Sequence, residues 1–85
     1  MDWNIEGTSL IKEFEFANFR DAVTFVNNIL PLAEEANHHP DLLIHSYRKV
    51  KVMLTTHEKN AVTGKDRALA TRIDALTRPS PVVTS

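Results

Sequence analysis

The sequence predicts an α+β fold of two layers, in the order ββαββα, with a four-stranded antiparallel sheet covered on one face by two helices. Short segments near residues 3–16 and 42–56 alternate apolar and polar side chains, which is typical of half-buried strands. Two longer segments, near residues 19–33 and 63–76, repeat apolar side chains every three or four residues, which is typical of amphipathic helices. Placing both helices on one face of the sheet buries these apolar faces in a single core.

The first two strands are expected to form a hairpin. Trp3 and Ile5 alternate with polar residues, and Gly7-Thr8 then provides a turn. Lys12 falls on the apolar side of the second strand, so this face is either partly open or the lysine extends its ammonium group to solvent. The apolar residues of the second strand are Leu10, Phe14 and Phe16.

The first helix is expected to begin after Asn18, whose side chain can cap it, with Asp21 in the third helical position. It should end near Asn37, because Pro40 disfavours helical geometry in the residue before it. Pro31 lies inside the helix and predicts a kink, since it lacks an amide proton. The predicted buried stripe comprises Phe19, Ala22, Val23, Val26, Ile29, Leu30 and Ala33.

The second half of the chain is expected to repeat the strand, strand, helix order. Strands at residues 42–46 and 50–56 flank a turn at 47–49, and a loop follows at 58–62. Thr63 can cap the last helix, with Asp66 in its third position, and the predicted buried residues of that helix are Leu69, Ile73 and Leu76. We expect one domain over residues 1–78 and a flexible C-terminal tail over 79–85.

The length and composition indicate a small globular protein. With 85 residues, of which 42% are hydrophobic and 25% charged, the chain can build only a modest core. Such a core is marginal in isolation, so we expect a homodimer or a homotetramer.

Composition also excludes several classes of function. The absence of cysteine excludes disulfides and thiolate chemistry and fits a reducing, cytoplasmic compartment. A net charge of −1 argues against nucleic acid as the partner, because neutralising phosphates requires a clustered basic surplus. No apolar run approaches the roughly 18 residues of a membrane span, and no leader pattern opens the chain. A small neutral ligand is therefore the favoured partner.

Three histidines in polar, loop-like settings are the main candidates for chemistry. His38 and His39 follow the first predicted helix, and His57 ends a predicted strand. Imidazole is the side chain whose ordinary pKa, about 6.5, suits proton transfer near neutral pH. Glu34 precedes His38 by four residues, on the same helical face if the last turn persists, so its carboxylate could orient an imidazole.

Each of these residues also has a purely structural interpretation. The histidine pair could simply cap a helix C-terminus, Glu34 could be a solvated acid, and Asp66 could act only as the partner of Thr63. A zinc site is disfavoured, because adjacent histidines rarely bind one metal and the chain has neither HExxH nor cysteine. Trp3 fits the core better than a ligand stack, and His45, inside a predicted strand, is expected to be structural.

Taken together, the pattern resembles the pterin-4a-carbinolamine dehydratases. The likeness covers residues 3 to about 76 and depends on the joint pattern rather than on any single motif. Asn37 stands where many members of that family have aspartate. The matching residues are Glu34, His38, His39, Pro40, Tyr47, Thr55, Thr56, His57, Glu58, Thr63 and Asp66.

The resemblance implies a hydro-lyase that removes water from a 4a-hydroxytetrahydropterin and gives the quinonoid dihydropterin, in tetrahydrobiopterin recycling. It implies that His38, His39 and His57 are catalytic and that Glu34 and Asp66 orient them. No metal and no cofactor are expected. The substrate-binding residues that it implies are Trp3, Asn37, His38, His39, Thr55, Thr56, His57 and Glu58.

A second hypothesis is a non-catalytic protein-binding or assembly module on the same fold. Relatives of this fold include dimerisation cofactors of transcription factors and degenerate, assembly-factor-like members. All three histidines are present here, which favours the enzyme, although activity and binding to a protein partner can coexist. Which histidine is the acid and which is the base stays open.

Overall fold

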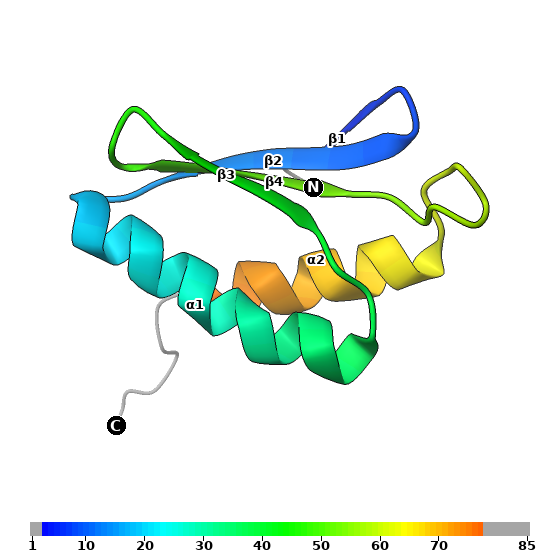
Figure 1. Cartoon of the computed structure of the whole chain (residues 1–85). Coiled ribbons are helices and arrows are strands. Elements are labelled where there is room, and N and C mark those ends of the chain that lie inside the picture. Colours follow the sequence, from blue (N-terminus) through cyan, green and yellow to red (C-terminus); the bar gives the residue numbers. More distant parts are fainter. Residues whose placement is uncertain (1–2, 78–85) are drawn as a thin grey trace.

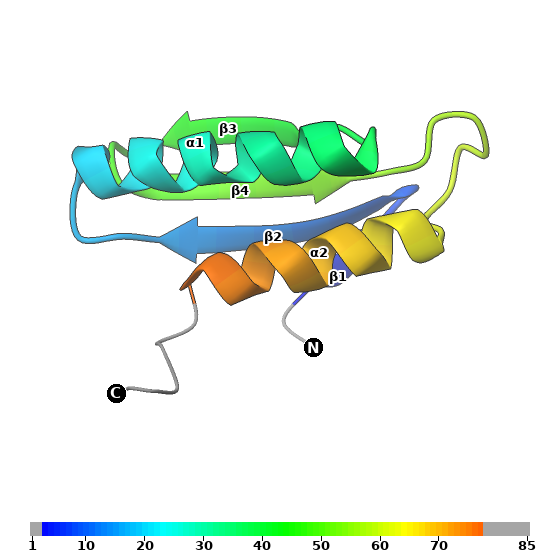
Figure 2. The same ribbon diagram turned by 90° about the horizontal axis from the view of Figure 1, so that it is seen from below.

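A computed structural model describes residues 3–77, and these form two layers as predicted. Strands β1 (Asn4–Glu6) and β2 (Ser9–Glu15) form the N-terminal hairpin, and helix α1 (Phe19–Ala36) follows. Strands β3 (Asp41–His45) and β4 (Lys49–Leu54) form a second hairpin before helix α2 (Gly64–Thr77). The sheet is fully antiparallel in the order β1-β2-β4-β3, and both helices cover the same face (Figures 1 and 2). The predicted α+β fold is therefore confirmed.

The core lies between the helices and the two central strands. In β4, Val50, Val52 and Leu54 are completely buried and alternate with half-buried residues, as the period-two pattern predicted. Antiparallel pairing places Leu10 opposite Leu54 and Phe14 opposite Val50, so the apolar face of β2 meets that of β4. The remaining buried apolar residues are Trp3, Ala22, Phe25, Ile29, Ala33, Leu69, Ala70 and Ile73.

Both helices begin with the predicted caps. The Asn18 side chain accepts a hydrogen bond from the Asp21 amide at 2.8 Å. At the start of α2, the Thr63 amide donates to the Asp66 carboxylate at 2.9 Å, while the Thr63 hydroxyl accepts from the Lys65 amide at 3.3 Å. This is the reciprocal arrangement of a capping box. Helix α1 continues through Pro31, which is exposed, and ends at Ala36.

Some predicted core positions are wrong. Phe19 is 55% exposed, Leu30 60% and Leu76 37%, whereas Phe25 and Ala70, which were not predicted, are buried. The buried face of α1 is narrower than the apolar stripe in the sequence. Phe19 and Leu30 lie on one side of that buried face and are therefore exposed. Leu76 lies in the last turn of α2, beside a surface hollow.

The strand boundaries in the second hairpin also differ slightly from the prediction. Strand β3 begins at Asp41, and the turn occupies residues 46–48, with Ser46 and Tyr47 at a φ of 50°. The ladder of β4 ends at Leu54, and Thr56 forms an isolated bridge with Ala61. The expected tail at residues 79–85 lies outside the described residues. Neither helix within residues 3–77 has both the length and the apolar character that crossing a membrane requires.

Candidate functional site

Most of the predicted site residues lie at one end of the molecule, where α1 ends and where the loop after β4 leads into α2 (Figure 1). Asn37 ends α1 in the left-handed conformation, with φ 50° and ψ 44°, which asparagine tolerates better than most residues. The His38 amide then donates to the Ala33 carbonyl at 3.1 Å, closing the helix end. This turn brings His38 to the first turn of α2.

His38 is held by the carboxylate of Asp66. The distance between His38 Nε2 and Asp66 Oδ1 is 2.5 Å, and the His38 side chain is 11% exposed while that of Asp66 is fully buried. The second oxygen, Oδ2, accepts hydrogen bonds from the Thr56 hydroxyl at 2.8 Å and from the Thr63 amide at 2.9 Å. The Asp66 carboxylate therefore contacts three groups: the His38 ring, the Thr56 hydroxyl and the Thr63 amide.

The environment of Asp66 fixes the role of each nitrogen of His38. Burial raises the pKa of the Asp66 carboxyl, but hydrogen bonds from His38, the Thr63 amide and the Thr56 hydroxyl outweigh it and hold that pKa below its ordinary value of 3.8. Asp66 is therefore ionised at neutral pH and can only accept hydrogen bonds. Nε2 of His38 must carry the proton in this contact, which leaves Nδ1 as the nitrogen that is available for chemistry.

His39 has a carboxylate partner of its own. Its Nε2 lies 2.6 Å from Glu34 Oε2, and both side chains are exposed. The imidazole that Glu34 contacts is that of His39 and not that of His38, because Asn37 ends the helix and turns His38 away toward α2. Glu34 reaches the following residue instead.

His57 differs from the other two in having no fixed side-chain partner. It is exposed, and within residues 3–77 its ring makes no hydrogen bond or ion pair. Its loop is closed beneath it, since Thr56 pairs with Ala61 and the His57 carbonyl accepts from the Asn60 amide at 3.1 Å. The backbone of the loop is thereby held by hydrogen bonds, while the imidazole is open to solvent.

These side chains surround one pocket with a volume of about 440 Å³. That volume lies in the range of small-molecule sites, roughly 300–1,000 Å³. Sequence reasoning did not single out Asp41 and Lys65, and it used Pro40 only as a helix-ending signal and a matching residue. Neither Asp41 nor Lys65 carries a motif that could have indicated a role in a site. The pocket is lined by Asn37, His38, His39, Pro40, Asp41, Thr55, Thr56, His57, Glu58 and Lys65.

Three other residues considered from the sequence lie outside this pocket, namely Trp3, Tyr47 and His45. Trp3 is buried in the core, stacks edge-on against Phe14 and donates from Nε1 to Asp74 at 3.0 Å, so the structure places it in the core and not in this pocket. Tyr47 is exposed in the turn at the other end of the β3–β4 hairpin. His45, at the end of β3, contacts Glu13 across the outer face of the sheet.

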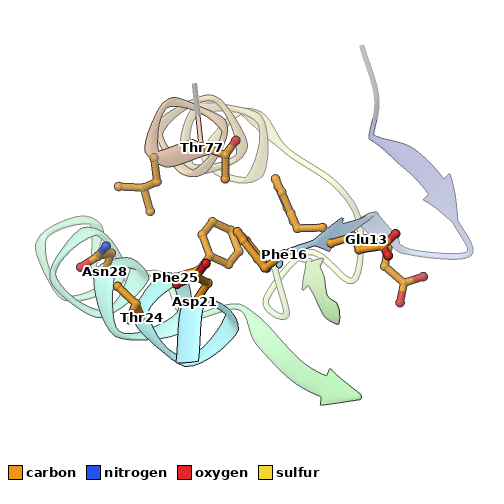
Figure 3. Close-up of a pocket in the computed structure, with 10 residues that line it drawn as sticks. Glu13, Phe16, Asp21, Thr24, Phe25, Asn28 and Thr77 are labelled. Atoms are coloured by element: carbon orange, nitrogen blue, oxygen red, sulfur yellow. The ribbon is translucent and has the colours of Figure 1, made fainter. Parts of the chain in front are cut away.

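A second hollow, with a volume of about 550 Å³, lies at the opposite end of the molecule, between the start of α1 and the end of α2. Phe16 and Phe25 lie side by side in it, with ring centroids 4.9 Å apart, and Asp21 and Thr77 border it (Figure 3). No histidine lines this hollow. Among the described residues, no group of three His, Asp or Glu side chains is placed to hold a metal ion.

Comparisons with known proteins agree with this arrangement. A family model described as pterin 4 alpha carbinolamine dehydratase matches residues 1–76. A provisionally named pterin-4-alpha-carbinolamine dehydratase of Thermomicrobium roseum is 46% identical over 74 residues, which cover 87% of this chain and 78% of the relative. One from Chloroflexus aurantiacus is 44% identical over 75 residues, covering 88% of this chain and 80% of the relative.

Two solved structures share the fold. A transcriptional coactivator/pterin dehydratase from Brucella melitensis is 30% identical, with a TM-score of 0.83 over 91% of this chain and 83% of its own. A pterin dehydratase-like protein identified as a RuBisCO assembly factor in the alpha-carboxysome is 25% identical, with a TM-score of 0.72 over 92% of this chain and 89% of its own. By fold, pocket and sequence, the chain belongs to the pterin-4a-carbinolamine dehydratase family.

Proposed function

We propose that this protein is a hydro-lyase that converts 4a-hydroxytetrahydropterin into quinonoid dihydropterin and water. The observation that carries the proposal is the convergence of three imidazoles on one pocket, two from the segment after α1 and one from the loop after β4. Family membership supplies the substrate class, and the site supplies groups suited to the reaction.

The reaction needs two proton transfers. The C4a–O bond breaks as the leaving hydroxyl takes up a proton and departs as water, and a ring N–H proton passes to a base. Positioned side chains contribute typically 10²–10⁴-fold to such steps, and imidazole can act in either direction near neutral pH. We assign both tasks to the set His38, His39 and His57, with Asp66 and Glu34 holding the first two rings.

The pocket also suits a flat polar heterocycle. Its volume of about 440 Å³ accommodates a bicyclic ring system. Asn37 and Thr55 border it. The Asn37 amide can donate and accept at the edge of a pterin, and the Thr55 hydroxyl, whose proton is directed at the Thr8 carbonyl, can accept. We further propose that the reaction belongs to tetrahydrobiopterin recycling in the cytoplasm, in keeping with a chain that has no cysteine.

The direct test is a stopped-flow assay of 4a-hydroxytetrahydropterin breakdown. Wild-type protein should accelerate the loss of the carbinolamine well beyond the uncatalysed rate, in proportion to protein concentration, and the acceleration should saturate with substrate. A rate equal to that of buffer at every protein concentration would reject the proposal. Denatured protein is the control for nonspecific buffering by side chains.

A second candidate is a protein-assembly role, which one structural neighbour is named for. The exposed apolar side chains Phe19 and Leu30 on α1 offer surface for a protein contact. Retention of the three histidines around one pocket favours the dehydratase, since an assembly role alone would not require them. Substituting all three histidines separates the two, because only the dehydratase activity should be lost.

A further inference from the structure

Thr56 connects the two sides of the pocket. One side is formed by His38 with Asp66, and the other is the loop that carries His57. Thr56 follows β4, is only 3% exposed and is the only buried polar residue besides Asp66 within residues 3–77. Its hydroxyl lies 2.8 Å from Asp66 Oδ2 and 2.7 Å from the Thr63 hydroxyl. A buried hydroxyl with two partners at these distances is fully engaged in the fold.

The direction of these hydrogen bonds follows from the charge on Asp66. An ionised carboxylate only accepts, so the single hydroxyl proton of Thr56 points at Oδ2. The Thr63 hydroxyl must then donate to Thr56, and it accepts in turn from the Lys65 amide at 3.3 Å. One directed chain therefore runs from the first turn of α2 through two hydroxyls to the carboxylate that holds His38.

The backbone of the same residue fixes the opposite side of the pocket. The Thr56 amide donates to the Ala61 carbonyl at 3.0 Å, and the Thr56 carbonyl accepts from the Lys59 amide at 3.0 Å. These bonds close the short loop that carries His57. Thr56 thus holds the partner of one imidazole with its side chain and the loop of another with its main chain.

We propose that Thr56 is a positioning residue for the dehydration, acting through Asp66 on His38 rather than by contacting the pterin. The inference deepens the proposed function and rests on it. Its neighbour Thr55 contrasts with it, since the Thr55 hydroxyl donates at 2.5 Å to the Thr8 carbonyl and has no contact with Asp66.

The test compares Thr56→Val, which keeps the shape and removes the hydroxyl, with Thr56→Ser, which keeps the hydroxyl. Thr56→Val should lower kcat about 10- to 100-fold, since small misplacements of catalytic groups cost about 10²-fold, and should leave KM within a few-fold. Thr56→Ser should recover kcat to within a few-fold of wild type. A rise in KM with kcat unchanged would show that the hydroxyl contacts the substrate, and would overturn the inference.

A second measurement does not depend on activity. NMR titration of the Asp66 carboxyl carbon should show a higher pKa in Thr56→Val than in wild type, because one hydrogen bond to the ionised form is lost. Thr56→Ser should titrate as wild type does. An unchanged titration in Thr56→Val would also overturn the inference. If wild type lacks dehydratase activity, the proposed function fails, while the titration still tests the hydrogen-bond chain.

Two further variants distinguish a loss of positioning from a loss of folding. Val50→Ala removes packing at the far end of β4, so it should lower the melting temperature without changing the Asp66 titration or the kcat of the folded fraction. Thr63→Val removes the hydroxyl that donates to Thr56 and accepts from the Lys65 amide, while it keeps the Thr63 amide bond to Asp66, and it should shift kcat in the same direction by a smaller factor. If Thr56→Val does not fold, a wild-type kcat in Thr63→Val contradicts the directed chain.

Discussion

The exchange Asp66→Asn makes a sharp test of the arrangement around His38. Two donors, the Thr56 hydroxyl at 2.8 Å and the Thr63 amide at 2.9 Å, face one oxygen of Asp66. In the variant, the single amide oxygen will occupy that place, so the NH₂ group must face His38. His38 Nε2 then has to accept a hydrogen bond, and the ring proton moves to Nδ1.

The size of the effect follows from this reversal. With the ring proton on Nδ1, that nitrogen can no longer serve as a proton acceptor in the proposed reaction, and the charge that stabilises an imidazolium at 2.5 Å is gone. A proton-transfer group contributes about 10²–10⁴-fold, and the corresponding exchange behind the histidine of serine proteases lowers kcat about 10⁴-fold. We expect kcat to fall at least about 10²-fold, and by no more than in His38→Ala. The fold should persist, because the amide oxygen still accepts both donors.

Stopped-flow dehydration gives kcat, and ¹⁵N shifts of the His38 ring give the tautomer. Asp74→Asn is the matched control, since Asp74 is also an acid of α2 with two donors, Trp3 and Lys12, but it lies outside the pocket. If the His38 tautomer changes and kcat does not, Nδ1 of His38 is not a reacting atom. If the His38 ring keeps its wild-type tautomer in Asp66→Asn, the orientation expected for the new side-chain amide is wrong.

Four further predictions follow from the same features. Replacing His38, His39 or His57 by Ala should lower turnover far more than thermal stability, whereas His45→Ala should stay within a few-fold of wild-type turnover; the opposite ranking of His38 and His45 would disprove the site. Because the pKa of Asp66 is lowered in the folded protein, its stabilising effect is complete above pH 3.8 and is lost as the pH falls through the folded pKa. Wild type should therefore exceed Asp66→Asn in unfolding free energy at pH 6, with the difference shrinking below pH 3.8; a constant difference in denaturant titrations would contradict this. Exhaustive chelation should leave activity intact, and stoichiometric zinc whose removal abolishes turnover would refute a metal-free mechanism. Light scattering at tens of micromolar, on the order of working concentrations for a small marginal core, should show a dimer or tetramer, and a monomer would argue against self-association.

Local signals in the sequence predicted the fold well. The caps formed by Asn18 and by Thr63 with Asp66 involve residues at most three positions apart, so the pattern alone located both helix starts. The alternation in β4 likewise predicted three fully buried residues. Phe19 and Leu30 were misplaced because a period of 3.6 gives a broad stripe, and only packing decides which part of it faces the sheet.

Most of the residues that line the candidate pocket could be named from the sequence, but their contacts could not. His38 and Asp66 are 28 positions apart, and their pairing depends on how α1 and α2 pack. Which imidazole Glu34 contacts could not be predicted, because one residue, Asn37, adopts a left-handed conformation and ends the helical spacing. The chain of hydrogen bonds from Thr63 through Thr56 to Asp66 could not be predicted either. In the sequence, Thr63 is an ordinary helix cap and Thr56 an ordinary residue at the end of a strand.

The unequal exposure of the three imidazoles has a consequence for repeated turnover. The proposed loss of water consumes no net proton, so each cycle would leave the acid one proton short and the base with one proton too many. His39 and His57 stand open to solvent and can exchange protons directly with buffer, whereas His38 is 11% exposed and can do so only through the pocket. In the proposed reaction, two of the rings would therefore regain their starting protonation by direct exchange with solvent, and the third would do so only after the product has left the pocket.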